Sequence, residues 1–480
     1  MLVKERTQVF HIPAGENSFV IRDITKGSVQ ADWCIFRKRS LSFMNQARQN
    51  RAKKWCVGFL CVLLVVGVLL FAVVTSNRNI PDEMQSTEQD ISTAENETKN
   101  GALQMLILRR GAIDVTAGKE GFYYAGYHPI HTIQYYDEKS QTMIPLCNRP
   151  ECAHNNSECT AYVANEGYTL FMNPAKDALF LIEQENFSDE TNETYPGQNL
   201  YRIEPDGSNR TRILHLKNRD LKRTFAGDGR YLYFITTFYN EESGTDCYEL
   251  NRLDYGTGTH VKLETFEKQT KLIGAFDQTI LLEQDNGRDI IAATESDILQ
   301  YDLNHKEASS VLHYDIEDPV GAHTIAYADG ANLYTIVPNG VKTAKLTQQD
   351  LRSGETSVIT EELPFYGYHG DGVYDAFFAD GKMVIESAEE GKQKVFAVDL
   401  QTGEEKEITL ATTTGIGPWC YQLCGSTQEN YLGMVDTVER QGDLIKPDGT
   451  KETVVFYAPK YAVIHKDDYI NSVQNIIELE

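Results

Sequence analysis

The sequence predicts an all-β protein, a seven-bladed β-propeller, behind a single N-terminal transmembrane helix. From residue 102 onward, short runs of β-branched and aromatic residues alternate with Gly, Asp and Asn, and the long apolar periodicity of helices is absent. A two-part pattern recurs seven times in this region, at a spacing of about 50 residues that is typical of propeller blades. Ahead of it lies one uncharged apolar segment that is long enough to cross a bilayer.

Residues 1–54 are predicted to form a basic cytoplasmic tail. They hold 11 basic and 4 acidic residues. The basic residues that lead up to the apolar segment, with no acidic residue among them, are Arg37, Lys38, Arg39, Arg48, Arg51, Lys53 and Lys54. Because positively charged flanks stay on the cytoplasmic side of a membrane, the N-terminus is expected in the cytoplasm.

Residues 55–74 are predicted to form the transmembrane helix. They read WCVGFLCVLLVVGVLLFAVV and carry no charge, and a helix of this length spans a hydrocarbon core of roughly 30 Å. The basic leader is too long for a cleaved signal peptide, and no clear small-residue cleavage site follows the apolar run. The anchor is therefore expected to stay, which places the rest of the chain outside the cytoplasm.

Residues 75–101 are predicted to be a disordered linker. The stretch is rich in Ser, Thr, Asn, Gln and Glu and almost free of large apolar side chains, so it cannot bury enough surface to order itself. The whole chain carries a net charge of −25 although its first 54 residues are basic, so the exported part is strongly acidic. This charge argues against nucleic acid as a partner.

Residues 102–480 are predicted to form the propeller. The first part of the repeated pattern is an apolar strand after a turn, which begins at Gly121, Ala178, Tyr231, Thr279, Asn332, Lys382 and Tyr431. The second part is a pair of apolar strands around a polar turn, where Gly or Asn supplies the positive φ of a tight hairpin. Six or eight blades are the alternative counts. The divergent last repeat and a leading strand at Leu103 are candidates to close the ring by sharing one blade.

Four residues between the first and second repeats form a candidate metal site. Cys147, Cys152, His154 and Cys159 supply three thiolates and an imidazole, the ligand set of a closed, tetrahedral structural zinc site. A disulfide is the rival interpretation, because thiols pair outside the cytoplasm and the six cysteines beyond the apolar segment are an even number. Both interpretations remain open from the residues alone.

Two stretches resemble known propeller families. LYRIEPDGSNRTRIL (residues 200–214) resembles the repeat unit of extracytoplasmic TolB-like and low-density-lipoprotein-receptor-like propellers. LCNRPECAHNNSECTAY (residues 146–162) is similar to a Cys/His signature of a cell-envelope propeller family, a domain of unknown function, in Gram-positive and mostly anaerobic bacteria. The resemblance covers the predicted propeller. It implies a membrane-anchored or lipoprotein propeller and is tied to no known activity.

The sequence favours a binding or protein-interaction module over an enzyme. It contains no G-x-S-x-G nucleophile elbow and no H-E-x-x-H zinc motif, so no catalytic or cofactor-binding residue is assigned. The expected partner is an envelope protein, a peptide or a glycan on a propeller face. The alternatives are a polysaccharide lyase or hydrolase that works in the central channel and, third, a transmembrane signal relay.

Overall fold

The computed structural model describes residues 8–10, 19–21, 102–106, 114–126, 132–163, 169–185, 195, 197–287, 293–316, 324–339, 343–364, 376–389, 392–413, 418–445 and 451–479. The chain divides into two compact units, Met1–Ala94 and Glu95–Glu480. In the first unit, β1 (Gln8–Phe10) and β2 (Phe19–Ile21) pair as antiparallel strands. The rest of the predicted tail, the predicted membrane helix (55–74) and the predicted linker (75–101) lie outside the described residues. Within the described residues, no helix is both long and apolar enough to cross a membrane.

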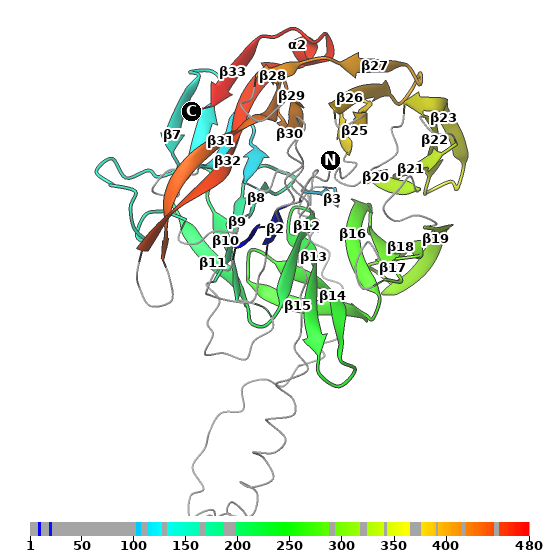
Figure 1. Cartoon of the computed structure of the whole chain (residues 1–480). Helices are drawn as coiled ribbons and strands as arrows, with labels where there is room; N and C mark the ends of the chain where they lie inside the picture. Colours follow the sequence, from blue (N-terminus) through cyan, green and yellow to red (C-terminus); the bar gives the residue numbers. More distant parts are fainter. Residues whose placement is uncertain are drawn as a thin grey trace, which may run out of the picture. The chain divides into compact units, whose positions relative to one another are not determined.

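The second unit is a ring of seven antiparallel sheets, each built mainly from one continuous stretch of chain (Figure 1). The first blade holds β4 (Val115–Ala117), β5 (Gly121–Gly126), β6 (Thr132–Asp137) and β7 (Thr142–Pro145). The second holds β8 (Thr169–Met172), β9 (Leu179–Gln184), β10 (Gln198–Ile203) and β11 (Arg210–Leu216). The third holds β12 (Asp220–Gly227), β13 (Tyr231–Asn240), β14 (Thr245–Asp254) and β15 (Thr259–Phe266), joined by β3 (Gln104–Met105).

The remaining blades repeat the same order of strands. The fourth holds β16 (Gln269–Phe276), β17 (Thr279–Asp285), β18 (Glu295–Asp302) and β19 (Glu307–Asp315). The fifth holds β20 (Ile325–Asp329), β21 (Asn332–Pro338), β22 (Thr343–Asp350) and β23 (Thr356–Pro364), and the sixth holds β24 (Ala376–Ala379), β25 (Lys382–Glu389), β26 (Lys392–Asp399) and β27 (Glu405–Ile408). A short pair, β28 (Ala411–Thr413) and β29 (Pro418–Cys420), precedes the seventh blade of β30 (Gln422–Ser426), β31 (Asn430–Ile445), β32 (Lys451–His465), α2 (Lys466–Ile470) and β33 (Ile476–Leu479).

The seven predicted apolar strands are the second strands of the seven blades, so the predicted blade count is confirmed. These strands are buried on both faces because each blade is covered by its two neighbours, which explains their continuous apolar runs. In β13, for example, six consecutive residues are buried, whereas β15 at the outer edge of the same blade is largely exposed. The predicted two-strand turns coincide with the outer hairpins of the first six blades.

Aromatic side chains fill the space between neighbouring blades. Phe171 of β8 stacks on Phe225 of β12 with ring centroids 4.4 Å apart, and both side chains are fully buried. Because the first strands of successive blades lie next to one another around the axis, each such contact joins two blades. The core is therefore divided among the junctions of the ring rather than gathered at one centre.

The ring closes without a shared blade, so the prediction that Leu103 and the last repeat share one blade is wrong. The seventh blade takes all its described strands from residues 422–479, and the strand at Leu103 joins the third blade instead. Side chains join the first and seventh blades: the Tyr461 hydroxyl donates to Asp114, and the Thr427 hydroxyl donates to Glu138 at 2.9 Å. Buried apolar residues of both blades complete this seam.

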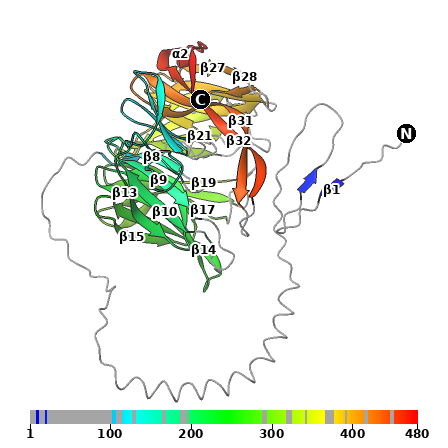
Figure 2. The same ribbon diagram turned by 90° about the vertical axis from the view of Figure 1, so that its left-hand side faces the viewer.

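The seventh blade also carries the longest hairpin of the described chain. β31 and β32 pair along their whole length, whereas β30 pairs only with Tyr431–Met434 and β33 only with Tyr461–Ile464. The rest of the hairpin therefore extends as a two-stranded ribbon, which Figure 2 shows running away from the blades. The last repeat differs in sequence from the others because it contains this ribbon and α2, which the other blades lack among their described residues.

Candidate metal centre

The four predicted metal ligands lie together. One ligand atom from each of Cys147, Cys152, His154 and Cys159 lies within 4.8 Å of every other. The cluster sits in the connection from β7 to β8, between the first and second blades, where the sequence analysis places it. A tetrahedral site of three Zn–S bonds of about 2.3 Å and one Zn–N bond of about 2.0 Å needs donors only slightly closer together than these. The donor set and its spacing therefore fit zinc.

The loop that carries the cluster is fixed to both blades. The Thr160 hydroxyl lies 2.8 Å from the carbonyl oxygen of Gly207 and 3.1 Å from that of Leu146, so its one hydrogen is shared between the outer turn of the second blade and the start of the loop. The backbone N–H of Ile133 in β6 donates to the carbonyl of Ala161 at 2.7 Å. Cys159 is 2% exposed and packs in the apolar core that the two blades share.

His154 has an unusual backbone conformation. Its φ is 54°, in the left-handed region that costs a non-glycine residue roughly 1–2 kcal/mol. The turn brings Nδ1 of His154 to 3.3 Å from Sγ of Cys159. Strain of this kind persists where the surrounding structure determines it, and it concentrates at functional sites.

Arg149 adds a positive charge beside the sulfur atoms. Its guanidinium lies 3.4 Å from Sγ of Cys152 and donates to the carbonyl of Glu158, which ties the two ends of the loop together. Zinc with three thiolates and one neutral imidazole carries a net negative charge, so a guanidinium at this distance stabilises the filled site.

The thiols already differ in acidity. Burial raises the pKa of Cys147, but hydrogen bonds from the Arg149 backbone, the Thr160 hydroxyl and the Arg149 side chain outweigh it and lower that pKa to about 6. Burial raises the pKa of Cys159 to about 11. Metal binding therefore has to displace the proton of Cys159.

A disulfide would engage two of the four clustered side chains, whereas a metal ion would engage all four. The thiols of Cys147, Cys152 and Cys159 are all free in the described structure. Joining any two of them would leave the third outside that bond, and neither Cys247 of β14 nor Cys424 of β30, the other two cysteines whose side chains the structure describes, belongs to the cluster. A zinc ion takes all four donors at once.

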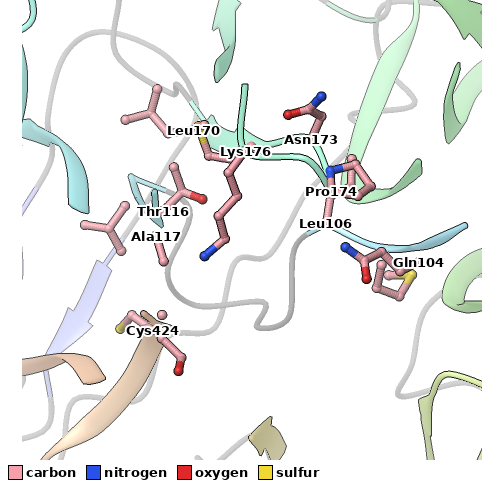
Figure 3. Close-up of a pocket in the computed structure, with 14 residues that line it drawn as sticks. Gln104, Leu106, Thr116, Ala117, Leu170, Asn173, Pro174, Lys176 and Cys424 are labelled. Atoms are coloured by element: carbon pink, nitrogen blue, oxygen red, sulfur yellow. The ribbon is translucent and has the colours of Figure 1, made fainter. Parts of the chain in front are cut away.

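A second candidate site is a cavity at the ring axis. It has a volume of about 140 Å³ and is lined by β4, β8, β30 and the residues at and after β3 (Figure 3). Among its described lining residues there is no carboxylate and no histidine, and Lys176 is the one charged side chain. Lys176 reaches into the cavity and donates to the carbonyl of Gly118 at 2.8 Å, and burial lowers its pKa.

Sequence reasoning found the four ligands but missed their surroundings. Arg149 and Thr160 hold the loop through hydrogen bonds to backbone carbonyls, and no residue pattern predicts such bonds. Lys176 lies in the turn after β8, and only the closure of the ring brings it to the axis.

No model of a known protein family matches the chain, and no curated protein matches it in sequence. Solved structures do match. An oligogalacturonate lyase from Vibrio parahaemolyticus is 12% identical over 76% of this chain and 92% of its own, with a TM-score of 0.45. TolB from Acinetobacter baumannii is 13% identical over 64% of this chain and 62% of its own, with a TM-score of 0.31. The propeller domain of the Trilobed protease from Pyrococcus furiosus is 14% identical over 74% of this chain and 97% of its own, with a TM-score of 0.40. These similarities concern the fold alone.

Proposed function

We propose that the chain is a membrane-anchored binding module that presents its propeller outside the cytoplasm to an envelope protein, a peptide or a glycan. The axial cavity is the observation that supports binding over catalysis. Cleavage of a glycosidic bond needs a placed acid and base, which are usually carboxylates, and the described cavity lining offers none.

We further propose that Cys147, Cys152, His154 and Cys159 bind a structural zinc ion. Four protein ligands leave no open position for a substrate, so the ion would stabilise the loop instead of taking part in a reaction. Because the loop contacts both the first and the second blade, the ion would also hold one junction of the ring. A rigid loop at a junction is a suitable surface for recognition.

The binding function is tested with the purified full-length chain on arrays of envelope glycans and peptides. We expect retention of at least one ligand class at micromolar concentration, and recovery of that ligand with unchanged mass. A Cys247→Ser variant is the matched control, because it loses a thiol outside the metal cluster and should bind equally well. Shortened or unsaturated products would establish the lyase or hydrolase alternative, and the absence of any ligand would contradict the proposal.

The membrane anchor is tested by charge insertion. Leu64→Arg together with Val65→Arg should move the protein from the membrane fraction to the alkaline extract, because each arginine at a helix centre opposes insertion by about 3 kcal/mol. Leu64→Ala with Val65→Ala should leave the protein in the membrane. A wild-type chain that alkali extracts fully would refute the anchor. If deletion of residues 1–50 changed transcription in the cell, that result would favour the signal relay instead.

A further inference from the structure

The segment Leu103–Leu106 enters the ring as an extra strand. β3 pairs antiparallel with β12, with Met105 opposite Ala226 and Gln104 opposite Gly227. The backbone N–H of Leu106 donates to the carbonyl of Phe225 at 2.9 Å, which extends the pairing by one residue. The third blade therefore has five strands, and the fifth is supplied by residues that lie more than a hundred positions earlier in the chain.

This segment lies in the central channel. β12 is the first strand of its blade, and β3 also lies against β16, the first strand of the next blade. The axial cavity is bounded on one side by Gln104, Met105 and Leu106 and on the other by the first strands of the seventh, first and second blades. Figure 1 shows β3 near the middle of the ring. The cavity of about 140 Å³ therefore lies in the channel beside the segment.

The contacts of the segment are those of a bound ligand strand. Leu103 is 5% exposed and packs between the third and fourth blades, with Met105 partly buried against the same core. Leu106 packs against the neighbouring core of the second and third blades. A Cβ atom on Gly227 would lie 2.9 Å from Cδ1 of Leu106, so the glycine permits this close approach.

We propose that the inner edge of β12 is a binding site for an extended apolar peptide, and that the chain's own segment Leu103–Leu106 occupies it as an intramolecular ligand. Without the segment, the backbone groups of β12 that pair with it would lie unpaired in the channel, which is the condition under which a sheet edge accepts a strand. Main-chain pairing supplies affinity, and the pockets for Leu103, Met105 and Leu106 supply specificity. This inference rests on the proposed binding function and names a peptide as the ligand class.

The position of the segment makes the site self-limiting. A ligand joined to its site by the chain has a high effective concentration, so a free peptide competes poorly until the segment is released. The segment directly follows the predicted linker (75–101), so force or binding on the linker would act on the segment first. Release of the segment would enlarge the channel and expose the β12 edge together.

The test uses the full-length chain with a protease recognition sequence placed within residues 107–113. The propeller is folded before the cut, so the experiment does not depend on a variant that folds without the segment. After cleavage, the N-terminal fragment should stay bound and should be released by excess synthetic peptide GALQMLILRR, the sequence of residues 101–110. The same peptide with Leu106→Pro lacks the donor to Phe225 and should release the fragment about tenfold less effectively.

Two results would overturn the proposal. Immediate loss of the fragment after cleavage would mean that the segment has no affinity of its own, and a retained fragment that excess peptide does not displace would mean that β3 is a fixed part of the blade. Ala102→Asp is the matched protein control, because Ala102 is exposed and its charge should leave retention unchanged. A negative result on the ligand arrays with a positive result here would count against the propeller face as a ligand surface and leave the peptide site intact, because the segment blocks that site in the uncut chain.

Discussion

Replacement of Cys159 by serine is expected to abolish zinc binding and to produce the largest loss of stability of any single change in the loop. Cys159 is both a proposed ligand and a 2% exposed member of the core between two blades. A metal that binds only the folded chain stabilises it by about 4 kcal/mol when its free concentration is about 1,000 times Kd. The variant loses this stabilisation by the metal, and it also buries a serine hydroxyl in an apolar site.

Metal analysis and thermal unfolding measure this prediction. The wild-type chain should contain one zinc per molecule and should unfold at a lower temperature after treatment with a chelator. Cys159→Ser should contain no zinc and should not respond to the chelator. Cys247→Ser, a buried cysteine of the third blade, should keep its zinc and its chelator response. A wild-type chain without metal, in which mass analysis shows two hydrogens missing, would establish the disulfide instead.

Asp114→Asn is expected to stabilise the chain at pH 7.5 by about 3 kcal/mol and to change little at pH 4. Asp114 is 4% exposed at the seam between the first and seventh blades. One oxygen accepts from the Tyr461 hydroxyl, and Oδ2 has no hydrogen-bond partner among the described residues. Burial raises the pKa of Asp114 from 3.8 to about 6, against the lowering effect of the Tyr461 hydrogen bond.

The direction of the pH dependence follows from this raised pKa. Between pH 3.8 and about 6 the folded chain binds the Asp114 proton more tightly than the unfolded chain does, so the free energy of unfolding falls as pH rises through that window. Asparagine has no proton to lose, and it keeps an acceptor for Tyr461. Carboxylates such as Asp399, whose pKa Lys382 and nearby backbone donors lower to about 2, contribute equally to both proteins and cancel in the difference.

Denaturant unfolding of both proteins between pH 4 and pH 8 provides the measurement. The difference in the free energy of unfolding should grow as pH rises from 4 to about 6 and then stay constant. Glu242→Gln removes an exposed carboxyl group and should show no such difference. A constant difference at every pH would mean that Asp114 keeps an ordinary pKa at the seam.

The sequence predicted the repeat far better than the closure of the ring. Second strands such as the one that begins at Tyr231 can be predicted because burial on both faces requires a continuous run of apolar residues. The turns can be predicted because they need residues, such as Gly207, that adopt positive φ readily. Leu103 directly precedes a short strand, β3 (Gln104–Met105), so the predicted strand exists in part. The sheet edge that this strand joins depends on the space beside Gly227. A local sequence pattern cannot predict a contact between residues so far apart in the chain.

The candidate metal centre was also predicted only in part. The four ligands stand close in the sequence, so their residue types alone indicated a common site. The left-handed conformation of His154 could not be predicted, because only a few per cent of non-glycine residues adopt it and nothing in the neighbouring sequence indicates such a turn. The guanidinium of Arg149 lies beside Sγ of Cys152 because of how the loop folds, and that fold depends on contacts with distant residues, such as Thr160 with Gly207.

The absence of a shared blade has a consequence for how the chain is made. Since the four sequential strands of each blade come from one continuous stretch, they can pair as soon as that stretch has been synthesised, and successive blades can be added in order from the N-terminal end. The seam is different, because Asp114 and Tyr461 are separated by 347 positions. It can form only when translation is almost complete, so an interrupted chain would keep finished blades and an unclosed ring.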